Sequence, residues 1–130
     1  MKRMLLGLFL LGGLLLAGDL NWERDPKSAL AKAEKENRPV MVMVESDHCR
    51  WCKKMQYKTL ADDEVSRRLE KFVLVKIDRD GSDAKELPFV KYVPTIYFMT
   101  PQKKILERIT GYFSVSDFGS WLDDVNRQLK

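Results

Sequence analysis

The sequence predicts an α/β domain with a central four-stranded mixed sheet flanked by helices. Three observations lead to this prediction. Helix and strand patterns alternate over the first part of the chain, which favours parallel strands joined by right-handed crossovers. The run over 40–44 is wholly apolar, as expected for a strand buried on both faces of such a sheet. Two strand patterns separated by a short turn follow over 95–110, and they predict a hairpin that adds antiparallel strands.

The first expected element of the domain is a helix that starts at Pro26 and ends before Asn37. Asp25 is a favourable N-cap, and proline suits the first helical turn. Lys32 and Glu36 have the spacing of a helical ion pair. Trp22 stands in the polar segment before this helix, and we expect it to pack on the domain.

The later elements follow from apolar periodicity, acidic helix starts and turn residues. They are helices over 49–60, 62–70, 84–92 and 115–129, and strands over 72–77, 95–99 and 105–110. Pro88 has no amide hydrogen, so it must interrupt or bend the third of these helices. The last helix is amphipathic. Its apolar face consists of Phe118, Trp121, Leu122, Val125 and Leu129.

Residues 1–18 have the pattern of a secretory signal peptide, which leaves residues 19–130 as the domain. Lys2 and Arg3 form a positive start, an apolar run follows, and Ala17 and Gly18 offer small residues for cleavage. The alternative is an uncleaved anchor, but the run is short for a bilayer span. We therefore expect an exported, periplasmic protein.

The charge of the chain argues against nucleic acid as a partner. The formal net charge of +4 shrinks when Lys2 and Arg3 leave with the signal peptide. We expect a mixed-sign surface without a basic block, whereas phosphate binding needs clustered lysines and arginines.

The two cysteines of the chain, Cys49 and Cys52, stand where the strand over 40–44 gives way to a helix. A sulfur at such a turn lies near the first unpaired amide hydrogens of the helix, which favour the reactive thiolate. Cys52 lies one turn further, within bonding reach. A disulfide that closes so short a loop gains little chain entropy, so chemistry explains the pair better than stapling does.

The order of elements, the C-x-x-C motif after the first buried strand, and Val93-Pro94-Thr95 before the third strand resemble the thioredoxin fold. The resemblance covers about 25–130. Within that superfamily the chain is similar to small exported thioredoxin-like proteins, namely those of sulfur-oxidation operons and the periplasmic C-terminal domain of the transmembrane disulfide reductase. The segments Arg38-Pro39-Val40-Met41 and Cys52-Lys53-Lys54-Met55 carry this narrower similarity.

The resemblance implies a role for each motif residue. Cys49 matches the nucleophile and Cys52 the resolving thiol. Pro94 matches a cis-proline facing the pair, and Val93 offers backbone groups to an extended client segment. The implied protein is a periplasmic thiol–disulfide oxidoreductase without a bound cofactor or metal. It reduces disulfides of client proteins, is re-reduced by a membrane electron donor, and acts as a monomer.

Three features depart from the family pattern. Met43 occupies the place of a buried acid, so the proton of Cys52 goes either to Glu45 or to water. Glu45 points the same way as Met43 only if the strand stays regular to its end. The dipeptide between the cysteines is Arg50-Trp51, and His48 replaces the usual aromatic residue before the nucleophile.

Other interpretations of these residues stay open. Two thiolates can carry Cu(I), and a non-catalytic client-binding domain is a further alternative. Arg50 and His48 either lower the pKa of the nucleophile or mark a solvated helix start, whereas Lys53 and Lys54 are expected to belong to a solvated helix start. Trp51 is either a client contact or a lid. Two sets are expected in or near the core, where they have no role in client or copper binding. They are the aromatic residues Phe89, Tyr92 and Tyr112 and the methionines Met41, Met43, Met55 and Met99.

Overall fold

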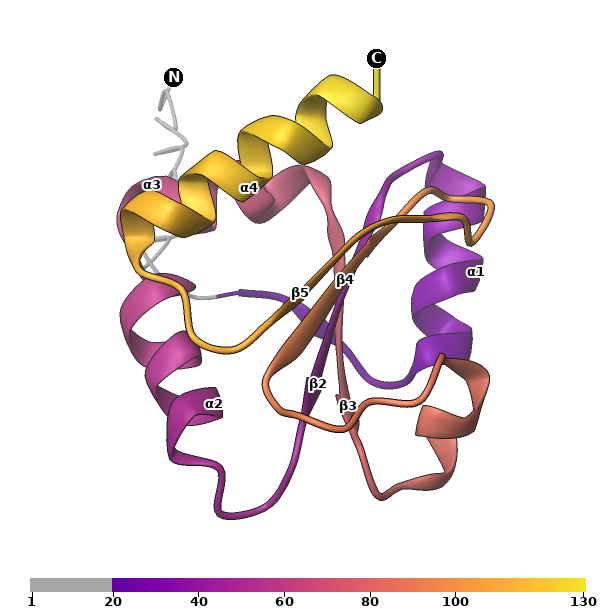
Figure 1. Ribbon diagram of the computed structural model, residues 1–130. Coiled ribbons are helices and arrows are strands. Elements are labelled where there is room, and N and C mark those ends of the chain that lie inside the picture. Colours follow the sequence, from indigo (N-terminus) through magenta and orange to yellow (C-terminus); the bar gives the residue numbers. More distant parts are fainter. Residues whose placement is uncertain (1–19) are drawn as a thin grey trace, which may run out of the picture.

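The computed structural model describes residues 20–130, and it contains a mixed sheet with helices on both faces (Figure 1). The predicted signal peptide over 1–18 lies outside the described residues. Within residues 20–130, no helix has both the length and the apolar character that a bilayer span requires.

The sheet has five strands, one more than predicted. They are β1 (Trp22–Glu23), β2 (Val40–Glu45), β3 (Val73–Asp78), β4 (Thr95–Met99) and β5 (Ile105–Thr110). Their order in space is β1-β3-β2-β4-β5. β3 pairs in parallel with both β1 and β2, whereas β4 pairs antiparallel with β2 and β5. The sequence did not predict β1, because a strand of only two residues shows no hydrophobic periodicity.

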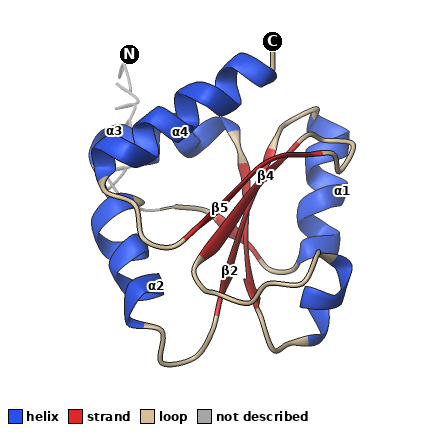
Figure 2. Ribbon diagram, in the orientation of Figure 1, coloured by secondary structure: helices blue, strands red, loops and turns tan. Residues whose placement is uncertain are grey.

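Helical segments cover both faces of the sheet (Figure 2). The α-helices are α1 (Pro26–Glu36), α2 (Arg50–Lys54), α3 (Asp63–Arg68) and α4 (Val115–Gln128). The π-helix η1 (Met55–Thr59) continues α2, and the 3₁₀ segments are η2 (Leu69–Lys71) and η3 (Ser82–Glu86). α1 lies on one face, and α2, α3 and α4 lie on the other (Figure 1).

The central strand β2 divides the hydrophobic core into two layers. Met41 and Met43 pack with Cys52 and Phe118 on the side of α2 and α4. The alternating valines of β2 pack with Ala29 and other residues on the side of α1. The four methionines expected in the core are buried there, and Trp22 packs against the α2 side as expected.

The predicted helix over 84–92 is wrong. Only η3 is helical, and its C-cap Leu87 already has the extended angles φ −113° and ψ 158°. Pro88 accounts for this, because a residue before proline disfavours helical angles. The predicted helix over 49–60 is confirmed in extent, although its second half is the π-helix η1.

The N-terminal cap of α1 is confirmed, but one expected ion pair is not formed. The Asp25 carboxylate accepts from the amide of Ser28 at 2.8 Å. Lys32 pairs with Glu23 of β1 at 2.8 Å, in place of Glu36. This ion pair joins α1 to the edge strand of the sheet.

Candidate active site

The turn after β2 places the sulfur of Cys49 at the start of a helix. His48 takes the left-handed angle φ 60°, and Cys49 follows as the N-cap of α2. The Cys52 amide donates to the Cys49 sulfur at 3.1 Å. An N–H donor aimed at sulfur stabilises a negative charge there, so the geometry favours the Cys49 thiolate when the pair is reduced.

Cys49 and Cys52 form a disulfide, with their Cα atoms 5.2 Å apart. The two ends of the bond differ in exposure. Cys49 is partly exposed, whereas Cys52 is only 2% exposed and belongs to the core on the α2 side. A reagent arriving from solvent therefore reaches the sulfur of Cys49 first.

The Val93–Pro94 peptide bond is cis, as the resemblance implies. Thr95 pairs with Val44, so this bond lies at the end of the sheet from which the cysteine turn leaves β2. The Pro94 carbonyl accepts from the Gly111 amide at 2.8 Å. Val93 packs against both core layers, and Cys49 packs against the layer that contains Cys52. The two motifs therefore share the same end of the sheet.

Trp51 lies between the cysteines in sequence, and its indole ring contacts one aromatic and two cationic side chains. Its centroid is 5.8 Å from that of Tyr112, which belongs to the segment between β5 and α4. The Lys54 ammonium is 5.1 Å from the Trp51 ring and 4.6 Å from the Tyr112 ring, and the Arg50 guanidinium carbon is 5.4 Å from the indole. Trp51 stays 46% exposed, so it covers Tyr112 and also presents a surface to solvent.

Tyr112 is the site residue whose position sequence reasoning did not find. It is half-buried, so its expected place near the core is confirmed, but its contact with the cysteine turn was not foreseen. The signal was its place directly after Gly111, where β5 has ended. Sixty residues of chain separate it from Trp51, so no local pattern links the two.

The position matching the buried acid of the family holds Met43, which is fully buried in the layer that contains Cys52. β2 pairs with β3 in register up to Glu45, opposite Asp78. The strand is thus regular to its end, and alternation turns Glu45 toward the same face as Met43. Glu45 is half-buried, so its carboxylate retains access to solvent.

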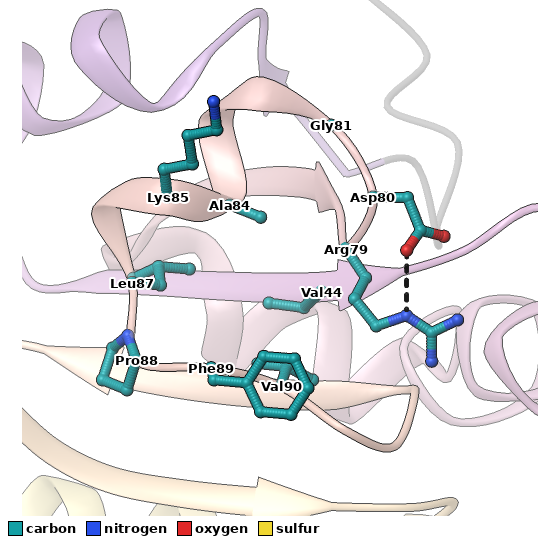
Figure 3. Close-up of a pocket in the computed structure, with 10 residues that line it drawn as sticks. All are labelled: Val44, Arg79, Asp80, Gly81, Ala84, Lys85, Leu87, Pro88, Phe89 and Val90. Atoms are coloured by element: carbon teal, nitrogen blue, oxygen red, sulfur yellow. Dashed lines mark ion pairs between the residues drawn. The ribbon is translucent and has the colours of Figure 1, made fainter.

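The segment that leads to Pro94 differs from its prediction. Phe89 and Tyr92 are 82% and 63% exposed, so their expected burial is wrong. With η3 and Val44, this segment lines a pocket of about 370 Å³ (Figure 3). Arg79 pairs with Asp80 at 3.5 Å and donates to the Lys91 carbonyl at 3.0 Å, which ties the segment to the end of β3. Neither cysteine lines this pocket.

The family described as "Thioredoxin-like" matches residues 21–101. This chain belongs to the thioredoxin-like family. A solved thioredoxin from Thermus thermophilus is 30% identical and superposes with a TM-score of 0.70, covering 82% of this chain and 87% of that one. The predicted thioredoxin fold is confirmed.

Two curated proteins are similar to this chain in sequence. Thiol:disulfide interchange protein DsbD of Yersinia enterocolitica is 30% identical over 109 residues, which are 78% of this chain and 19% of that protein. Anterior gradient protein 3 of Xenopus tropicalis is 29% identical over 98 residues, or 74% of this chain. The match spans 59% of the length of that relative.

Two further solved structures share the fold. The C-terminal domain of DsbD from Neisseria meningitidis is 24% identical, with a TM-score of 0.61 over 75% of this chain and 90% of that one. The periplasmic thioredoxin SoxS of Paracoccus pantotrophus is 16% identical, with a TM-score of 0.59 over 72% and 100%. The site is that of a thioredoxin-fold oxidoreductase, with a C-x-x-C pair joined as a disulfide.

Proposed function

We propose that this protein is a periplasmic enzyme that reduces disulfides in client proteins through a Cys49–Cys52 dithiol–disulfide cycle. One observation carries the proposal. Cys49 at the helix N-cap is partly exposed, and its bonded partner Cys52 is buried. Such an asymmetric pair assigns attack to Cys49 and resolution to Cys52, as the family resemblance implies.

The cycle begins with the reduced pair. The Cys49 thiolate attacks one sulfur of a client disulfide, the client S–S bond breaks, and the departing client thiolate takes a proton. Cys52 then loses its proton, and its thiolate attacks the Cys49 sulfur. The mixed disulfide breaks, the second client thiol is released, and the Cys49–Cys52 bond forms. Two electrons have passed from the protein dithiol to the client.

Other residues hold the client and move the proton. Val93 offers its backbone to an extended client segment beside the cis bond at Pro94, so the client disulfide meets Cys49. Glu45 accepts the proton of Cys52, because the regular end of β2 turns it to the side of the sheet where Cys52 is buried.

The positions of the nearby cations support the reductive direction of electron flow. Arg50 and Lys54 lie against aromatic rings, and they stabilise the thiolate less than cations held against the sulfur would. The reduced form is then not strongly favoured, which suits a reductase. A membrane-bound dithiol protein re-reduces the pair, and the signal-peptide pattern over 1–18 supports a periplasmic location for the enzyme. The enzyme acts as a monomer.

Trapping of the mixed disulfide tests the proposal. Reduced Cys52→Ser should accumulate mixed disulfides with client proteins of a periplasmic extract, seen as bands that dithiothreitol removes. Cys49→Ser is the matched control and should form far fewer. Absence of adducts with Cys52→Ser would contradict the cycle. That result, together with tight stoichiometric Cu(I) binding, would favour a copper carrier. Partner binding that survives loss of both thiols would favour a non-catalytic domain.

A further inference from the structure

The segment that starts at the cysteine turn holds all the excess charge of the chain. From His48 to Ala61 there are four basic residues, Arg50, Lys53, Lys54 and Lys58, and no aspartate or glutamate. The formal charge of the whole chain is +4 and falls to +2 without Lys2 and Arg3 of the predicted signal peptide, so the other residues of 19–130 together carry a net charge of −2. The expectation of a mixed-sign surface without a basic block is therefore wrong for this segment.

The structure presents these four side chains on one helical segment, formed by α2 and η1, and we call them the basic face. All four are exposed. None of them forms an ion pair within residues 20–130, whereas the five ion pairs seen there occupy other lysines and arginines. The basic face is thus free to attract carboxylates from outside the chain.

Aromatic side chains accompany the cations of the basic face. Arg50 and Lys54 both lie over the ring of Trp51, and Tyr57 of η1 is strongly exposed. Aromatic rings and guanidinium groups are enriched where proteins bind other proteins. The composition of the surface therefore fits a polypeptide that carries both acidic and apolar side chains.

We infer that the basic face binds acidic residues that flank the disulfide of a client protein. The inference rests on the proposed function and names its substrate class. Arg50 directly follows Cys49, so a carboxylate bound to the face lies beside the sulfur that attacks. An extended segment leaves that sulfur accessible, whereas a flat anionic membrane seated on the same face would cover it. Complementary charge of this kind raises association rates, and salt screens it.

Three synthetic disulfide-bonded peptides provide the test. They differ in the four residues around the cystine, which are glutamate, serine or lysine. The second-order rate constant of reduction by the reduced protein is measured by stopped flow. At low salt we expect the glutamate peptide to react about tenfold faster than the lysine peptide, and at 0.5 M salt we expect the rates to converge to within about twofold.

Charge-reversal variants locate the effect. Lys53→Glu/Lys58→Glu changes two cations that touch neither Trp51 nor Tyr112, and it should abolish or reverse the preference. Lys27→Glu/Lys35→Glu is the matched control, because it makes the same charge change on α1, across the sheet (Figure 1). The control should keep the preference of the unaltered protein.

The other outcomes separate this inference from the proposed function. Equal reduction of all three peptides would overturn the inference and leave the reductase proposal in place. No reduction of any peptide would overturn both. Binding to vesicles of phosphatidylcholine and phosphatidylglycerol, lost in Lys53→Glu/Lys58→Glu and without any peptide preference, would overturn the inference in favour of a lipid surface.

Discussion

At the scale of single residues, the two cysteines differ because their surroundings differ. Cys49 caps a helix at the edge of the solvent, and its sulfur accepts an amide hydrogen. Cys52 is enclosed among apolar side chains, where a charged sulfur is disfavoured. A buried thiol of this kind needs a proton acceptor before it can attack, and Glu45 is the proposed acceptor.

Glu45→Gln tests that role. We expect release of client from the Cys49 mixed disulfide to slow by about 100-fold, because a positioned general base is lost, while the first attack by Cys49 keeps its rate. Rapid-quench kinetics with a single-turnover disulfide substrate separates the two steps. Glu86→Gln, which removes the same charge from η3, is the control. Unchanged release in Glu45→Gln would assign the proton to water.

At the scale of elements, α1 depends on its cap. The Ser28 amide and then its hydroxyl donate to the Asp25 carboxylate, and they lower the pKa of this group from its ordinary value of 3.8. A carboxylate whose pKa is depressed by folding stabilises the protein above its unfolded pKa. That stability is lost as the pH falls through the lower, folded pKa.

Asp25→Ala is therefore expected to lower the melting temperature by a few degrees at pH 7. The difference in melting temperature between Asp25→Ala and the unaltered protein should narrow once the pH drops below 3.8 and Asp25 takes up its proton. Thermal unfolding followed by circular dichroism from pH 7 to pH 2.5 measures this difference. Asp25→Asn is the control, because it keeps a hydrogen-bond acceptor at the cap that does not titrate. A difference that stays constant with pH would contradict this account of the cap.

The elements that were predictable are those whose residues carry a local signal. The apolar run of β2 and the amphipathic face of α4 are visible in the sequence as local patterns. The cysteine turn and Pro94 are likewise recognised from short motifs. β1 is different, because it exists only through pairing with β3 about fifty residues away. The contact of Trp51 with Tyr112 likewise depends on two segments meeting in space. Phe89 shows that an aromatic residue near a proline gives no sign of whether it is buried.

At the scale of the whole molecule, two apolar layers hold the sheet between its helices. Phe98 of β4 is fully buried in the layer on the α2 side. Its ring centroid lies 5.7 Å from that of Phe72 and 6.1 Å from that of Phe118. The same layer encloses Cys52, so the packing that stabilises the domain also keeps the resolving thiol out of solvent.

Phe98→Ala should lower the free energy of unfolding by about 3–5 kcal/mol, because it removes a fully buried ring and leaves a cavity. Phe89→Ala is the matched control, and its effect should stay within about 0.5 kcal/mol, because that side chain is 82% exposed. Urea unfolding gives both values. If Phe98→Ala lowers the free energy of unfolding by less than about 1 kcal/mol, the layer repacks easily around the lost ring and is not the closely packed core described above.

Equilibration of the protein with thiol–disulfide buffers of graded potential shows whether Cys49 and Cys52 cycle between dithiol and disulfide. The fraction of bonded cysteines is read by alkylation and mass spectrometry. We expect one reversible two-electron transition, with a slope of about 30 mV per tenfold change and a midpoint closer to about −270 mV than to about −120 mV. A pair that stays bonded in every buffer would contradict the redox cycle, and a midpoint near about −120 mV would contradict its reductive direction.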